Sequence, residues 1–198
     1  MSGVTTLERP ADTEPGVPER FPAITIRPPW AWCIAAAETL TALGVTPKLV
    51  ENRGRPVAEK WVGLDWAVHA GTRWDRDGAE DWRVQHAWRR YWDRPLEGRP
   101  VHTDSPTGAV VAVARLVGCH QAELDGCGNP CCRPWGEPWW ETGRGVDPAW
   151  HLVWANVRKL LRPVPVRGQL PVPWLLPPDL AAKVAAQLEE TKQREEQA

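Results

Sequence analysis

The spacing of hydrophobic residues divides the chain into short strands and a few helices. The stretch Phe21 to Arg27 reads as a first strand, and Pro28-Pro29 then opens a helix, because proline is tolerated in the first turn. The buried stripe of that helix recurs at helical spacing, at Trp30, Cys33, Ile34, Ala37 and Leu40. Gly44 is its expected C-terminal stop.

Later segments alternate or run apolar over lengths typical of strands. They lie at 48–53, 64–70, 108–120, 150–161 and 169–174. The centre of the third, Ala109 to Ala114, is apolar throughout, which predicts a strand covered on both faces. Pro163 and Pro165 confine the chain after the fourth to a sheet edge.

Two further helices are predicted. The run Asp77-Gly-Ala-Glu80 resembles a capping box and begins a helix that reaches about Trp92, with Val84, Trp88, Tyr91 and Trp92 on one face. A last helix runs from Asp179 to about Glu196 and becomes highly charged after Leu188. Short strands with a helix between the first two predict an α+β fold built on a small mixed β-barrel, since closure removes exposed strand edges.

The domain organisation follows from these elements. Residues 1–20 are polar and proline-rich and read as a disordered tail, and 21–176 form one domain with a Cys- and Trp-rich insertion at 121–147. Residues 177–198 form the C-terminal helix with a charged, fraying end. There is neither an apolar run long enough to cross a bilayer nor an N-terminal signal segment, so we expect a cytoplasmic protein with no membrane partner.

Composition adds a preference for an anionic partner. The net charge of −1 combines acidic ends with a mildly basic middle, and the chain has 14 Trp against one Phe and one Tyr. Arginine forms bidentate hydrogen bonds to phosphate and tryptophan stacks on bases, so this composition suits RNA. A GC-rich codon bias would favour the same residues, and a solvated surface without a special role is the alternative.

Several motifs resemble the ASCH family, whose members have a PUA-like barrel. Ile26-Arg27-Pro28-Pro29-Trp30-Ala31 is similar to the family's opening motif, and Gly44 through Lys48 to Glu51-Asn52-Arg53 is similar to its G-x-K-x-x-E signature. Further similar segments are His69-Ala70-Gly71, Gly108 to Val113, Asn156-Val157-Arg158 and Arg167-Gly168. The resemblance covers about residues 22–176 and implies RNA binding or RNA metabolism.

The sequence also departs from this pattern. Gly44 and Lys48 are four positions apart rather than two, and the last strand lacks the family's Gly-Leu-Trp ending. Some relatives hydrolyse the acetyl group of acetylated cytidine and others are reported as ribonucleases. In the hydrolases a hydroxyl residue follows the lysine by three positions, where this chain has Glu51, and 108–120 contain no Glu. We therefore do not predict that hydrolysis.

The candidate ligand-binding residues gather around the 48–53 strand. Glu51 and Arg53 share one face of it, so Glu51 is placed to accept from a base edge and Arg53 to contact phosphate. Lys48 is a phosphate contact, nucleophile or base. Trp30 is a stacking surface, Arg27 lies at the helix start and His69 is a candidate acid or base. The alternatives are a structural ion pair, a core Trp30 and a structural histidine.

The cysteines indicate a second kind of site. Cys119, His120, Cys127, Cys131 and Cys132 lie close together in sequence, and this crowding favours metal over disulfides inside a cell. Adjacent side chains on an extended chain diverge, so we expect Cys119 or His120, Cys127, and Cys131 or Cys132 as ligands. His151 would complete a structural zinc site. The alternative is reduced thiols, with no cofactor required, and Cys33 belongs to the core.

Three functions remain open from the sequence. The first is a module that binds RNA or a modified nucleobase through Arg27, Trp30, Lys48, Glu51, Arg53 and His69. The second is a nucleoside or RNA hydrolase that uses Lys48 or His69 as base, which requires these groups to converge. The third is a protein-interaction module that contacts another protein through the Trp-rich helix at 80–92 and the Cys-rich loop, which an exposed apolar patch across Trp135, Trp139 and Trp140 would support.

Overall fold

The structure is a computed structural model that describes residues 21–143 and 145–197. A six-stranded mixed sheet, in the order β2-β7-β4-β3-β1-β8, forms its centre, and β5 and β6 pair separately. Only β1 and β3 run parallel. The strands are β1 (Pro22–Ile26), β2 (Val50–Arg53), β3 (Asp65–Ala70), β4 (Ala109–Gln121), β5 (Trp139–Thr142), β6 (Gly145–Pro148), β7 (Trp150–Pro165) and β8 (Trp174–Leu175).

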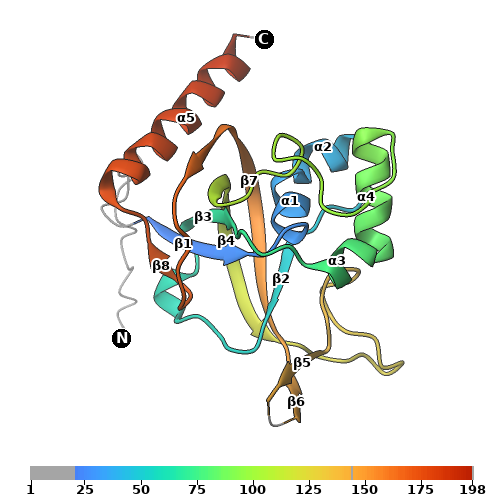
Figure 1. Ribbon diagram of the computed structural model, residues 1–198. Helices are drawn as coiled ribbons and strands as arrows, with labels where there is room; N and C mark the ends of the chain where they lie inside the picture. Colours follow the sequence, from blue (N-terminus) through green and yellow to red (C-terminus); the bar gives the residue numbers. More distant parts are fainter. Residues whose placement is uncertain (1–20, 144, 198) are drawn as a thin grey trace, which may run out of the picture.

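Helices cover both faces of this sheet. They are α1 (Trp30–Ala35), α2 (Ala37–Ala42), the 3-10 helix η1 (Glu59–Trp61), α3 (Arg76–Glu80), α4 (Trp82–Trp92) and α5 (Pro178–Glu196). Figure 1 shows α5 on one side of the sheet and α1 to α4 on the other. The α+β class predicted from the sequence is confirmed. None of these described helices is both long and apolar enough for a bilayer.

The two faces of the sheet have separate cores. Large side chains pack beneath α1, among them Ile24, Ile26, Trp66, Leu116, Leu152 and Trp154. Alternate residues of the same strands face the other way and pack with Trp174 and α5, among them Ala23, Ala67, Val110, Val113, Ala181 and Val184. The predicted double coverage of the 109–114 strand is therefore confirmed.

Both predicted helices in the first half are split. Ala36, with ψ near 5°, separates α1 from α2, whereas Gly44 ends the segment at φ +72° as expected. The capping box at Asp77–Glu80 was wrong. The carboxylate of Asp75 caps α3 by accepting from Gly78 N at 3.1 Å, and Asp81 caps α4 by accepting from Arg83 N at 2.8 Å.

The sheet has two ends, so the predicted barrel is not confirmed by its strand pairing. The end strands β2 and β8 form no ladder with each other within the described chain. A side chain spans part of the gap, since Arg53 Nη2 donates to the carbonyl of Thr25 in β1 at 2.8 Å. Sheet curvature thus brings β2 close to β1 although no backbone ladder joins them.

Segment lengths near the C-terminus and in the insertion differ from expectation. β8 has two residues rather than the predicted 169–174 strand, because Pro171 and Pro173 have no amide hydrogen for a ladder. The insertion contains the β5–β6 hairpin after an irregular segment at 122–138. The predicted tail at 1–20 lies outside the described residues.

Candidate nucleic-acid interface

Lys48 is buried just before β2, and its amine is fully engaged inside the protein. Its side chain is 3% exposed, and Nζ donates to the carbonyl of Val50 and lies 3.5 Å from Glu51 Oε2. The rings of Trp30 and Trp135 lie 5.3 and 5.8 Å from the same nitrogen, at cation–π distance. Lys48 therefore stabilises this corner of the fold and is not exposed to a phosphate.

Arg53 adds to the Lys48–Glu51 ion pair, so that Lys48, Glu51 and Arg53 form an ion-paired row. The shared strand face of Glu51 and Arg53 predicts this arrangement. Arg53 Nη2 lies 3.4 Å from Glu51 Oε1, and the two side chains are 21% and 12% exposed. The Nε of Arg53 is buried without a hydrogen-bond partner among the described residues. The row thus ends in an arginine with an unused donor, next to Thr25.

Trp30 lies at the border of two core clusters rather than on an open surface. Its Nε1 donates to Asp75 Oδ2 at 3.1 Å, its ring meets Trp135 edge to face at 6.4 Å, and Gly78 packs against it. Trp30 therefore packs beside Lys48 as part of the core, which is the alternative to a base-stacking surface that the sequence left open. At the start of α1, Ala31 N already donates to Arg27 O, and the Arg27 side chain is exposed.

His69 lies on the opposite face of the sheet from the core beneath α1. A bulge between Val68 and His69 interrupts the β3–β4 register. The Nε2 of His69 donates to Val166 O at 3.0 Å, its ring meets Trp174, and Nδ1 is buried without a partner. His69 therefore forms no hydrogen bond with Lys48 or Glu51 among the described residues, whereas Lys48 and Glu51 lie 3.5 Å apart.

Burial lowers the pKa of His69 below its ordinary 6.5, an effect partly offset by the bond to Val166. Between the two pKa values the unfolded chain binds more protons than the folded one. The stability that depends on neutral His69 is therefore complete above about pH 6.5 and is lost as the pH falls toward the folded-state pKa. We expect urea denaturation from about pH 8 to pH 5 to show this loss, and His69→Gln to reduce it. Parallel losses in both proteins would assign the effect to other groups.

Three exposed arginines lie on adjoining turns beside this row. Hydrogen bonds from Gly71 N to Ile26 O and from Asp75 N to Pro28 O hold the turn after β3 against the turn after β1. Gly168 packs against Thr25 and His69, which places a third turn beside them. Arg27, Arg73 and Arg167 come from these three turns, and none forms an ion pair within 21–143 and 145–197. We call these three residues the arginine rim.

The comparison with solved structures shows that the chain is similar to ASCH structures. The crystal structure of the ASCH protein from Zymomonas mobilis is 14% identical, with a TM-score of 0.45 over 83% of this chain and 93% of that one. A Tyr-to-Phe variant matches at 14% identity and a Ser-to-Ala variant at 13%, both with a TM-score of 0.45 over 83% of this chain, and over 96% and 94% of theirs. No family model and no curated protein matches.

The likeness to the ASCH structures lies in the backbone arrangement and assigns no residue role here. Surface shape is a separate observation. Two hollows, of about 390 Å³ between β7 and α5 and about 310 Å³ beside α4, are lined by residues other than those of the arginine rim.

The Cys- and His-rich segment gathers a different set from the predicted one. His120, Cys131, Cys132 and His151 bring their ligand atoms within 4.8 Å of one another. Cys119 and Cys127 are not in the group. The expectation that Cys131 and Cys132 diverge was wrong, because Cys132 adopts φ +60° and the chain is not extended there. Cys33 is fully buried, as predicted, and burial raises its pKa to about 12.

The proposed tryptophan patch is not formed as expected. Trp135 is 4% exposed and packs with Trp30 and Lys48, whereas Trp139 is 53% exposed. Asn52, for which no role was predicted, donates from Nδ2 to Trp135 O at 2.9 Å and accepts from Glu137 N at 3.0 Å. Its alternation with Glu51 and Arg53 in β2 was the available signal.

Proposed function

We propose that this protein binds single-stranded RNA across the arginine rim. The observation that carries the proposal is the gathering of Arg27, Arg73 and Arg167, exposed and without ion pairs to described residues, on three adjoining turns. Guanidinium groups that have no acidic partner remain available to phosphate oxygens, which they bind in a bidentate way.

The ion-paired row beside the rim provides groups that could contact the bases of the RNA. Glu51 keeps part of its surface exposed at 12%, and a carboxylate accepts from exocyclic amines of bases. Arg53 lies next to it with 21% of its side chain exposed, although its Nε is buried. Phosphate contacts from the rim and base contacts from Glu51 and Arg53 are the division of labour expected in RNA recognition.

The test is fluorescence anisotropy with a labelled single-stranded RNA at several salt concentrations. We expect the triple variant Arg27→Ala, Arg73→Ala, Arg167→Ala to bind at least about tenfold more weakly, with a log–log salt slope lower by about 2, near 0.7 per lost phosphate contact. Cooperative unfolding of the variant, unchanged from wild type, would show that the fold is intact.

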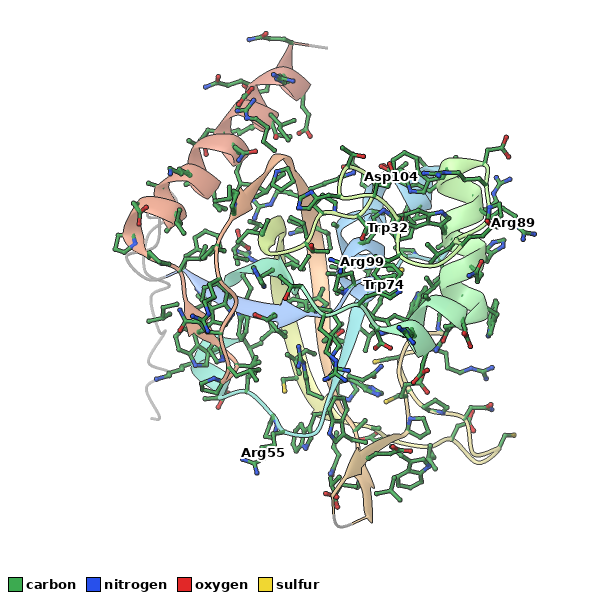
Figure 2. The ribbon with its side chains drawn as sticks, viewed as in Figure 1. Trp32, Arg55, Trp74, Arg89, Arg99 and Asp104 are labelled. Carbon is green, nitrogen blue, oxygen red and sulfur yellow. The ribbon has the colours of Figure 1, made fainter. Side chains whose placement is uncertain are left out.

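A charge-matched control separates the rim from general electrostatics. Arg89 lies on the outer side of α4 (Figure 2), and Arg133 and Lys183 are also exposed. The triple variant Arg89→Ala, Arg133→Ala, Lys183→Ala removes the same charge and should bind almost as wild type does. Equal losses in the two triple variants, or no RNA binding by wild type at low salt, would contradict the proposal.

A further inference from the structure

Two histidines and two cysteines meet where β4 ends and β7 begins. His120 and His151 are register partners on these neighbouring strands, and Cys131 and Cys132 come from the irregular segment at 122–138. The Sγ of Cys131 lies 3.4 Å from His151 Nδ1, and that of Cys132 lies 3.3 Å from His120 Nε2. None of the four belongs to the arginine rim or to the ion-paired row.

Backbone carbonyls fix both imidazole rings so that one nitrogen of each is left for a metal. His151 Nε2 lies 2.9 Å from Glu137 O, and His120 Nδ1 lies 3.0 Å from Gln121 O. A carbonyl only accepts, so these nitrogens carry the hydrogens. The remaining lone pairs, on His151 Nδ1 and His120 Nε2, are those that face the sulfurs. Such outer hydrogen bonds are the usual support of metal-bound histidine.

Two of the S–N distances in this group are close to those around a tetrahedral ion, and all four ligand atoms lie within 4.8 Å of one another. Zn–S and Zn–N bonds of about 2.3 and 2.0–2.1 Å at tetrahedral angles place S and N about 3.6 Å apart. The observed 3.3 and 3.4 Å are close to this value. We propose that His120, Cys131, Cys132 and His151 bind one zinc ion in a closed, structural site. Two thiolates balance the charge of the ion, and four protein ligands fill its coordination.

The site has a definable structural task. Between β4 and β5 the chain runs through 122–138 with only one isolated bridge, Leu124 to Pro130. Zinc would hold the 122–138 segment, through Cys131 and Cys132, against β4 and β7. Trp135, three residues after Cys132, packs beside Lys48, and Asn52 holds its carbonyl. Zinc would thus anchor the wall that covers Lys48.

The first measurement uses the full chain as purified. Elemental analysis after gel filtration should find one zinc per chain, and cobalt in its place should give the charge-transfer and visible bands of a tetrahedral thiolate site. Cys131→Ser and His151→Asn should lose the metal, whereas Cys119→Ala and Cys127→Ser, which remove sulfurs outside the group, should retain it. Retention by the first pair or loss in the second pair would overturn the assignment.

Thiol alkylation of wild type tests the site even if the ligand variants fail to fold. Cys127 is exposed and should react at once. Cys131 and Cys132 should be protected until a chelator is added, and protected again when zinc is returned. Equal reactivity of all three thiols with zinc present would overturn the proposal. So would a disulfide between Cys131 and Cys132, located by peptide mapping of the unreduced protein.

Gly136→Ala provides a variant that keeps every ligand. An added Cβ would lie 2.3 Å from Cys131 O, 2.8 Å from His151 Cε1 and 3.0 Å from Cys132 Cβ, closer than real contacts allow. Gly126→Ala, with open space around the new Cβ, is its control. We expect Gly136→Ala to release zinc to a weaker chelator than wild type requires, and Gly126→Ala to match wild type. Unchanged zinc retention in Gly136→Ala would contradict the placement of the site.

Discussion

Replacing Lys48 by Met is expected to lower the free energy of unfolding by about 3–5 kcal/mol, because it leaves Glu51 nearly buried with a weakened set of partners. The side chain of Lys48 is 3% exposed and its amine lies against two indole rings, so its removal disturbs both the ion pair and the aromatic wall. Urea denaturation followed by tryptophan fluorescence measures the change.

The double variant Lys48→Met, Glu51→Gln separates these two contributions. Removing both charges avoids the unpaired carboxylate, so we expect the double variant to be more stable than Lys48→Met alone. Arg53 retains its bond to Thr25 O in either case. A single variant within about 1 kcal/mol of wild type would show that Lys48 is a solvated surface charge.

Gly168→Ala should destabilise the protein by about 3 kcal/mol, at the upper end of overpacking costs. An added Cβ would lie 2.5 Å from His69 Cε1, 2.7 Å from His69 Nδ1 and 2.7 Å from Thr25 Oγ1. His69 is fully buried against Trp174 and Val166, so its ring has little room to move. Thermal unfolding of the variant would measure the cost.

Two further variants make this prediction specific. Gly118→Ala adds a Cβ at ordinary contact distance, 3.8 Å from Val153, and should change stability little. Combining Gly168→Ala with His69→Ser removes the ring that the new methyl meets, so the pair should lose less than the two single changes added together. Strict additivity would mean that the two residues are not in contact.

The central strands were predicted well because their signal is local, whereas β5 and β6 were not predicted and β8 lies at the end of the predicted 169–174 strand. The run from Ala109 to Ala114 has no polar residue, and a segment of this kind has few alternatives to a doubly covered strand. The helix breaks at Ala36 and Asp81 were missed because nothing in the apolar periodicity marks them. Asp81 ends α3 and caps α4 at once, and only the position of its carboxylate shows this.

The candidate site was predicted in part, for a different physical reason. Alternation along a strand places Glu51 and Arg53 together, and the structure pairs them. Alternation cannot show that Lys48 is buried, or that His69 faces the other side of the sheet, because both depend on how strands distant in sequence pack together. Likewise, Cys131 and Cys132 converge only because Cys132 has a left-handed backbone.

β2 is joined to β1 through a guanidinium rather than through a strand ladder, so this contact depends on one side chain. Rotation of the Arg53 side chain would free the Thr25 carbonyl without breaking any backbone pairing. Loss of this one hydrogen bond would therefore leave the β2–β7 and β1–β3 ladders and both core clusters in place.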